Sequence, residues 1–351
     1  MVYCGISDTI PDNDLFSSLN VCDWEEIYRM ARRQTVCGIC YDAFCRLPGE
    51  LLPPENILTR WVARVNAIEI TNRRMAQALS SLLGIFRNEG LRPVVQKGMS
   101  VARFYRIPEL RECGDIDLWF PAEDIDRAIK VAAENGSGLR HNPDSSVSFI
   151  FNGFIIEMHR RLISLSNPAG LRRIDRLIRE LGTDRNNSEE LPSPPALLEL
   201  LLVTVHIMRH AFGKGIGLRQ ICDYYRASVA LAGKYDAGLF AEVCRTTGIS
   251  RWVALLNDFV GKYFGIPSSG LPPSGLDGKS VKSPDALMEI IRDGGNFGQY
   301  INESVQGESV VGKGKLHTFK MFVGHARFAV SIAPKEALWS IGRLILGQFS
   351  R

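Results

Sequence analysis

Residues 93–118 hold the feature that most constrains the fold. A short apolar run at residues 93–96 is followed by a turn and a helical segment, and then by an Asp-Ile-Asp-Leu run in which Asp115 and Asp117 are one residue apart. In an extended strand the side chains alternate between the two faces, so both aspartates are predicted to project the same way while Ile116 points into a core. The pattern predicts a strand with one buried face and one carboxylate face.

The two carboxylates of this strand are expected to need a cation. Like charges held this close repel each other unless a positive charge lies between them. Mg²⁺ prefers oxygen ligands and usually takes one or two carboxylates together with water and substrate phosphates. The pair therefore predicts a Mg²⁺ site, and the alternative is a strand-end pair that caps a helix or pairs with an arginine. The same repulsion predicts that Asp117→Asn hardly changes the stability of the metal-free protein.

A hairpin is predicted further along the chain. Apolar runs at residues 147–151 and 154–158 flank an Asn-Gly pair at 152–153, and Asn-Gly between two such runs is a strong hairpin signal. On the second run Glu157 and His159 fall on one face, again because the period of a strand is two. We expect this strand to lie next to the aspartate strand, where Glu157 becomes a third metal ligand.

Together these motifs resemble the nucleotidyltransferase-like proteins of the DNA polymerase β superfamily, and most of all a poorly characterised bacterial branch in which Lys-Gly replaces Gly-Ser. The residues that carry the resemblance lie between positions 92 and 162 and are Lys97, Gly98, Tyr105, Arg111, Gly114, Asp115, Ile116, Asp117, Leu118, Glu157 and His159. The resemblance implies that the aspartate pair and the third acid hold two Mg²⁺ ions. It also implies that the glycine turn at the helix start contacts the phosphates of a nucleoside triphosphate.

The phosphate side of the predicted site begins at Lys97 and Gly98. Glycine lets the backbone approach a ligand, the helix start offers N–H groups, Lys97 adds a point charge and Ser100 adds a hydroxyl. The family places a serine directly after the glycine, where this chain has methionine. An ordinary strand-to-helix turn is the alternative. Arg111 is either a second clamp for phosphate or acceptor or the partner that neutralises Asp115.

His159 is predicted to orient Glu157 or the acceptor. Further along the chain, His206 and His210 are four residues apart and share a helical face, as zinc ligands can, although a polar seam between helices is the favoured interpretation. Asp223 resembles the acid of a helix signature that lies near the nucleotide in related transferases, where it supports the ligands or acts as a general base.

The helices at residues 196–232 are expected to form the second wall of the cleft. His210 and Asp223 would then face the metal site, and the acceptor would bind between the two walls. Asp223→Ala is therefore predicted to impair transfer while leaving nucleotide and Mg²⁺ binding largely intact.

Composition narrows the partners and the location. The chain has 42 Lys and Arg against 38 Asp and Glu, an excess too small to favour nucleic acid as the main partner. No apolar stretch reaches the roughly 18 residues of a membrane span. Residues 1–14 lack the basic and apolar regions of a secretory signal, so a cytoplasmic location without a membrane partner is expected. The eight cysteines are expected to be reduced, with Cys37 and Cys40 buried on a helix.

The expected fold class is α+β, with a small mixed-sheet nucleotidyltransferase core between two helical regions. About four strands are recognisable. The expected regions are an N-terminal helical region at 1–90, the core at 91–165 and a C-terminal helical domain at 166–351.

One long helix is predicted within the N-terminal helical region. Its apolar stripe runs from Ile57 to Phe86 at steps of three and four residues. Asn72 interrupts this stripe and predicts either a bend or a hydrogen bond to another helix.

The predicted reaction is attack by an acceptor hydroxyl or phosphate on the α-phosphate of a nucleoside triphosphate such as ATP, with pyrophosphate leaving. The sequence leaves open whether the acceptor is a small molecule, a protein or RNA. One alternative is a non-catalytic nucleotide-binding or toxin–antitoxin-type module on the same fold. Another is a metal-dependent phosphohydrolase, which needs a water-activating histidine cluster that only His206 and His210 are placed to supply.

Overall fold

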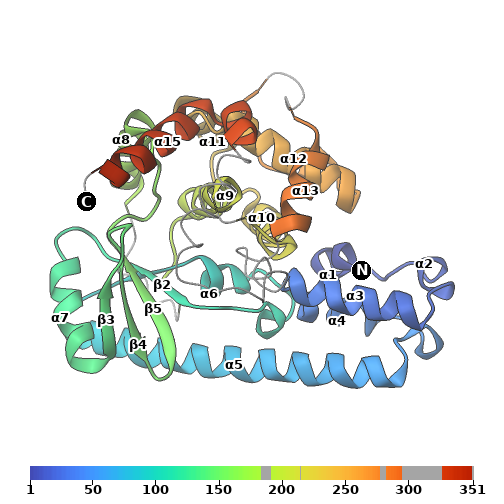
Figure 1. Ribbon diagram of the computed structural model, residues 1–351. Helices are drawn as coiled ribbons and strands as arrows, with labels where there is room; N and C mark the ends of the chain where they lie inside the picture. Colours follow the sequence, from blue (N-terminus) through green and yellow to red (C-terminus); the bar gives the residue numbers. More distant parts are fainter. Residues whose placement is uncertain (183–190, 214, 277–281, 295–325, 350–351) are drawn as a thin grey trace. The chain divides into compact units, whose positions relative to one another are not determined.

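The computed structural model describes residues 1–182, 191–213, 215–276, 282–294 and 326–349 (Figure 1). The chain divides into two compact units. The first comprises residues 1–32, 36–162 and 183–195, and the second comprises residues 33–35, 163–182 and 196–351. The expected α+β class, with a small mixed sheet and helical regions, is confirmed. The expected boundaries near residues 90 and 165 stay predictions.

The first unit contains a five-stranded mixed sheet in the order β1-β2-β5-β4-β3. The strands are β1 (Val94–Gln96), β2 (Ile116–Trp119), β3 (Ser137–His141), β4 (Val147–Phe151) and β5 (Phe154–His159). β2 and β5 run parallel with Asp117 opposite Glu157, and the other neighbouring pairs are antiparallel. The predicted contact between the aspartate strand and the second hairpin strand is therefore confirmed.

The predicted hairpin forms as β4 and β5. Its two turn residues have positive φ angles, 49° at Asn152 and 83° at Gly153, as a tight two-residue turn between twisted strands requires. β3 is a strand that the sequence analysis did not predict. Four of its five residues are exposed and it pairs with β4 only, so it carries no apolar alternation that would reveal it.

One face of the sheet packs against α5 (Glu55–Asn88) and α7 (Ile125–Asn135), and α5 runs beneath the strands in the view of Figure 1. Buried residues on this face come from alternate strand positions and from the two helices. They include Ile116, Leu118, Phe149, Ile156, Met158, Met75, Leu82, Phe86, Ala128 and Val131. Because strand side chains alternate, the residues between them point to the opposite face.

Asn72 lies buried in the middle of α5. Its Nδ2 donates hydrogen bonds to the carbonyl oxygens of Glu109 at 2.6 Å and Arg111 at 2.9 Å, and its Oδ1 accepts one from the backbone N–H of Cys113 at 3.4 Å. The hydrogen-bonding interpretation of Asn72 is thus confirmed. Its partners lie in the short 3₁₀ helix η2 (Pro108–Leu110) and in the loop that leads to β2.

The N-terminal helices of the first unit are α1 (Val2–Ser7), α2 (Asp14–Ser17), α3 (Val21–Arg33) and α4 (Cys37–Phe44), with η1 (Gly49–Leu51) before α5 and α6 (Lys97–Ala102) after β1. Trp61 of α5 is fully buried, and its Nε1 donates to the carbonyl oxygen of Cys37 at 2.9 Å. Cys37 and Cys40 are free and buried on α4, as predicted.

The second unit is helical in its described parts. Its named helices are α8 (Pro168–Leu181), α9 (Ala196–Phe212), α10 (Leu218–Leu231), α11 (Ala237–Thr247), α12 (Ser250–Phe264), η3 (Ser268–Gly270), α13 (Pro284–Gly294) and α15 (Pro334–Phe349). Trp252 of α12 donates from Nε1 to the carbonyl oxygen of Thr204 on α9 at 2.9 Å, which joins two buried helices. Throughout the described residues, no helix combines the length and apolarity needed to cross a membrane.

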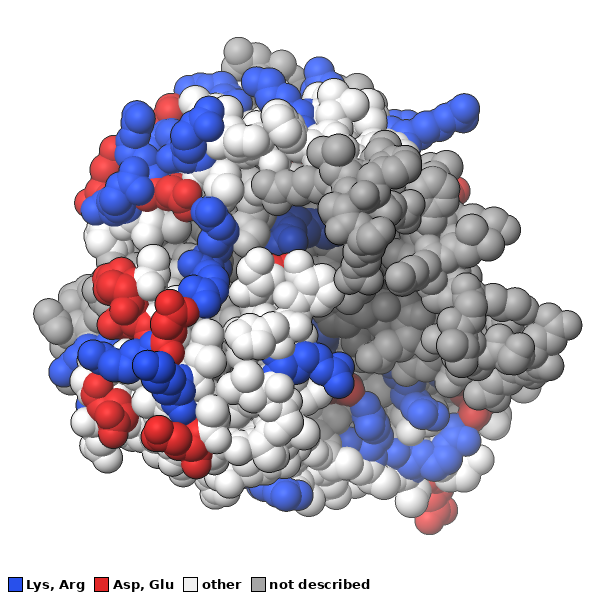
Figure 2. Space-filling model, turned by 60° about the vertical axis from the view of Figure 1, so that its left-hand side comes forward, with Lys and Arg blue, Asp and Glu red and all other residues white. Residues whose placement is uncertain are grey.

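Charges of both signs are mixed on the face drawn in Figure 2. Basic and acidic side chains lie interspersed along its left-hand side. The whole chain has 42 basic and 38 acidic residues. Interspersed charges largely cancel at a distance and give no extended field of one sign.

Candidate active site

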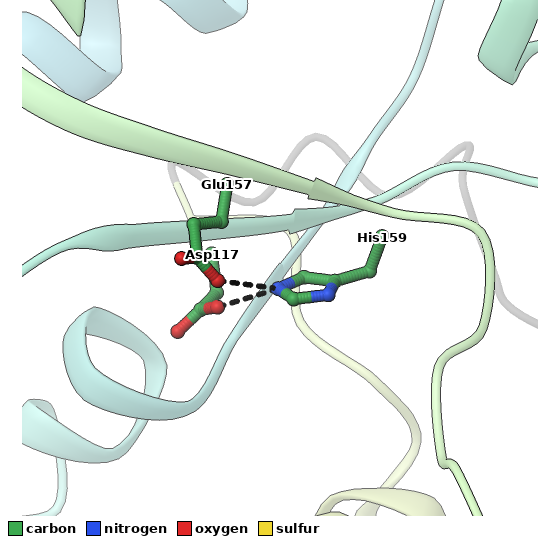
Figure 3. Close-up of side chains that lie close together, drawn as sticks. All are labelled: Asp117, Glu157 and His159. Carbon is green, nitrogen blue, oxygen red and sulfur yellow. Dashed lines mark hydrogen bonds and ion pairs between the residues drawn. The ribbon is translucent and has the colours of Figure 1, made fainter. Parts of the chain in front are cut away.

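Three side chains that could hold a metal ion converge on the sheet face opposite α5. Asp117 comes from β2, and Glu157 and His159 come from β5 (Figure 3). One ligand atom from each lies within 4.8 Å of the others. The cause is local: Asp117 and Glu157 are register partners on parallel strands, and His159 follows Glu157 by two positions.

Asp117 is a buried anion with two cationic or polar partners. Only 6% of its side chain is exposed, and its Oδ1 accepts from Lys97 Nζ at 2.8 Å and from His159 Nε2 at 2.6 Å. Burial acts to raise the pKa of Asp117, but the Lys97 ammonium and the hydrogen bond from His159 outweigh it and hold the pKa well below its usual range. Asp117 is therefore ionised.

Glu157 has a different environment from Asp117. Its side chain is 31% exposed, and its Oε2 lies 3.6 Å from His159 Nε2. Burial first, and then the negative charge of Asp117, raise the pKa of Glu157. A divalent cation bound between the two carboxylates would oppose that rise, because it favours the ionised form of both.

Lys97 supplies a cation for Asp117 where the sequence analysis expected Mg²⁺ or, as the alternative, an arginine. It is the first residue of α6, directly after β1, and has a φ of 49°, in the left-handed region that residues other than glycine rarely adopt. From there its Nζ reaches Asp117 Oδ1 and lies 3.5 Å from His159 Nε2. The ammonium compensates the buried carboxylate, so repulsion between aspartates no longer argues that Asp117→Asn is harmless.

Gly98 lies directly beside Arg111. A Cβ added at Gly98 would come within 3.1 Å of Arg111 Nη1, tighter than an ordinary contact. Arg111 is buried, and its Nη1 also donates to the carbonyl oxygen of Glu112 at 3.2 Å and to Cys113 Sγ at 3.3 Å. Glycine at this position thus admits a buried guanidinium next to the start of α6. The predicted phosphate contacts of both residues stay predictions.

The remaining predicted residues of the first unit are Ser100 and Asp115. Ser100 is buried, and its hydroxyl accepts a hydrogen bond from Arg103 Nη1 at 2.5 Å. Asp115 is partly exposed and immediately precedes β2. It does not belong to the group of three side chains that could hold a metal among the described residues, so the structure brings together two of the three predicted carboxylates.

His206, His210 and Asp223 lie in the second unit. The two imidazole rings of α9 are 4.4 Å apart between centroids, and Asp223 is buried on α10. Within the described parts of the chain, neither histidine joins a group of three metal-binding side chains. The predicted roles of the three residues stay predictions.

Sequence reasoning assigned Lys97 and His159 to the site but did not predict that both side chains contact Asp117. It assigned Lys97 to phosphate and His159 to Glu157 or the acceptor. The missing information was the pairing of β1 with β2, in which Gln96 lies opposite Asp117 and so brings the next residue, Lys97, near it. The sequence shows both strands but not that they are neighbours.

Residues 20–265 match a family described as an uncharacterised nucleotidyltransferase. The chain belongs to this family. The match covers the whole sheet with its three converging side chains and continues through α12, and it confirms the resemblance to nucleotidyltransferase-like proteins. Neither the curated proteins nor the solved structures give a match to this chain.

The donor set suits the kind of divalent ion that a nucleotidyltransferase family implies. Two carboxylates on neighbouring strands, one of them ionised and held in place by hydrogen bonds, suit Mg²⁺. The imidazole of His159 could supply a nitrogen ligand only in place of its Nε2 hydrogen bond to Asp117, and Mn²⁺ accepts such a ligand more readily than Mg²⁺ does. The residues present therefore fit one divalent cation between Asp117 and Glu157.

Proposed function

We propose that this chain transfers a nucleoside monophosphate from a nucleoside triphosphate to an acceptor hydroxyl or phosphate in a Mg²⁺-dependent reaction. The observation that carries the proposal is the convergence of Asp117, Glu157 and His159 within 4.8 Å on one sheet face of a nucleotidyltransferase-family chain. The divalent ion would bind through Asp117 and Glu157 and would stabilise negative charge on the phosphates.

Three further side chains would orient the metal ligand and compensate the charge of the phosphates. His159 donates to Asp117 Oδ1 and fixes the orientation of that carboxylate. Lys97 carries a flexible point charge at the start of α6, where a triphosphate would need compensation. Arg111 beside Gly98 offers a second, planar cation for the same phosphates.

Three further assignments belong to this proposal. Asp115, one residue before β2, serves as an additional ligand and allows a second Mg²⁺. Ser100 assists the phosphate contacts. Asp223 of the second unit acts on the acceptor side, as a general base or in support of one.

The test is transfer of label from α-³²P nucleotides. Purified protein is incubated with each of the four labelled triphosphates, Mg²⁺ and cell extract, and labelled products are separated. Asp117→Asn and Glu157→Gln should each lower transfer by about 100-fold or more, because each removes a charge on which the cation depends.

Asp126→Asn is the matched control. It also removes one carboxylate from the first unit, but its ion pair with Arg160 is exposed, so transfer should stay within about twofold of wild type. Release of phosphate without transfer would identify a phosphohydrolase instead. Nucleotide binding with no product of either kind would identify a non-catalytic module.

A further inference from the structure

One carboxylate oxygen of the site is already occupied by the protein itself. Asp117 Oδ1 accepts from Lys97 Nζ at 2.8 Å and from His159 Nε2 at 2.6 Å. A carboxylate oxygen has about two lone-pair positions, so these two donors use the capacity of Oδ1. A divalent cation that takes this oxygen must displace one of them.

Of the two donors, Lys97 is the one that a divalent cation would expel. It is a positive charge, and two cations within a few ångströms on one oxygen repel each other, whereas a neutral imidazole can stay beside a metal. The Lys97 side chain is 18% exposed and has a flexible four-carbon stem, so its ammonium can move away from Asp117 towards solvent or another anion.

We propose that the Lys97 ammonium competes with the divalent cation for Asp117 and that binding of the metal–nucleotide complex moves Lys97 from Asp117 onto the nucleotide phosphates. This inference rests on the function proposed above and adds to it a coupling between metal and nucleotide. The buried Asp117 exchanges one cation for another and is never left uncompensated. The displaced lysine gains a new anion only when phosphate arrives with the metal.

Two measurable properties follow from this exchange. The metal alone binds weakly to wild type, because it must expel Lys97 and leave it without a partner. The metal binds more tightly when the nucleotide is present, and by linkage the nucleotide binds more tightly when the metal is present. Removal of the lysine charge should strengthen the binding of metal alone and weaken this coupling.

The experiment measures Mn²⁺ binding by electron paramagnetic resonance, with and without a non-hydrolysable ATP analogue. Without nucleotide, Lys97→Met should bind Mn²⁺ about 10-fold more tightly than wild type, within the usual range of coupling between sites. The analogue should tighten Mn²⁺ binding to wild type by a similar factor, and it should tighten binding to Lys97→Met much less.

Lys130→Met is the matched control. Lys130 is exposed on α7, and its replacement changes the net charge by the same amount, so Mn²⁺ affinity should stay at the wild-type value. Lys97→Gln is a second variant that keeps a hydrogen-bond donor for Asp117 without the charge. Lys97→Gln should also bind Mn²⁺ more tightly than wild type, so it can serve as the test if Lys97→Met does not fold.

Equal Mn²⁺ affinity in wild type and in the folded Lys97 variants would overturn the competition and leave the proposed function standing. Absence of Mn²⁺ binding in wild type and variants, with and without nucleotide, would overturn the proposed function together with this inference. A lower Mn²⁺ affinity in Lys97→Gln than in wild type would also overturn the proposed competition. In that case Lys97 would support metal binding and not compete with the metal.

Discussion

At the residue scale, the buried Asp117 carboxylate is compensated by the Lys97 ammonium in the metal-free protein. Asp117→Asn leaves Lys97 facing a neutral amide in a buried position. We expect the free energy of unfolding of the metal-free protein to fall by about 3 kcal/mol, the usual cost of breaking a buried ion pair. This replaces the earlier expectation that the substitution is nearly neutral. Urea unfolding with a chelator present measures the change.

Asp126→Asn again provides the comparison for stability. Its ion pair with Arg160 is exposed, so the loss should stay below about 1 kcal/mol. If the free energy of unfolding fell by the same small amount in both variants, the Lys97–Asp117 pair would contribute no more to stability than an exposed ion pair.

The buried thiol of Cys40 predicts a pH dependence of stability. Burial raises the pKa of Cys40 to about 12, while a thiol in the unfolded chain has a pKa of about 8.5. The unfolded state therefore loses this proton first, and the free energy of unfolding should fall as pH rises above about 8.5. The slope contributed by one such thiol approaches about 1.4 kcal/mol per pH unit.

The measurement for Cys40 is urea unfolding at pH 8 and pH 10 under reducing conditions. Cys40→Ala should lose less stability than wild type over this interval, although its stability at pH 8 is lower because of the cavity. Cys22→Ala, at an exposed thiol, should keep the wild-type pH dependence. A Cys40→Ala protein with the full wild-type decline would contradict the argument.

Single residues show where sequence reasoning succeeds and stops. The period of two in a strand placed Glu157 and His159 on one face without any structure, because that alternation is fixed by backbone geometry. The contact of Lys97 with Asp117 depends on a left-handed φ and on which strands pair. Neither is encoded in a local pattern, so the sequence could supply the residues of the site but not its ion pairs.

At the element scale, α5 and the loop before β2 are joined through one side chain. Asn72→Ala would leave the carbonyl oxygens of Glu109 and Arg111 and the N–H of Cys113 without their α5 partner. Each buried group left without a partner costs about 1–3 kcal/mol, so we expect a loss of at least about 2 kcal/mol. Hydrogen exchange of the Cys113 amide should also speed up.

Asn135→Ala is a suitable control for Asn72. It removes a single hydrogen bond, from Nδ2 to the carbonyl oxygen of Val131 one turn earlier in α7. Its effect should stay within about 1 kcal/mol, with exchange in the loop before β2 unchanged. Faster loop exchange in both variants would show a general loosening and not the specific tie through Asn72.

The elements themselves were predictable in proportion to their apolar periodicity. The long stripe from Ile57 to Phe86 gave α5, and the Asn-Gly pair between two apolar runs gave the β4–β5 hairpin. β3 was not predicted, because a mostly exposed edge strand needs no apolar alternation in its sequence. Its formation depends on backbone pairing with β4, which a local sequence does not display.

At the scale of the whole molecule, the family match spans parts of both units. Residues 20–265 include the complete sheet of the first unit and α8 to α12 of the second. The sequence analysis expected three regions that follow one another along the chain, but contacts between distant segments decide the division. Residues 33–35, for example, belong to the second unit although they stand at the end of the N-terminal helix α3 and directly after it.

A contribution of the second unit to the reaction can be tested through Asp223. This residue is buried on α10, so we choose Asp223→Asn, which preserves side-chain size and removes the charge. If Asp223 acts on the acceptor side as a general base, nucleotide and Mn²⁺ binding should stay near wild type while transfer falls by about 100-fold, the usual contribution of such a base. Asp258→Asn, on α12 of the same unit, should leave both properties unchanged. Equal loss of nucleotide binding in Asp223→Asn would assign the residue to the triphosphate, and normal transfer would remove it from the reaction.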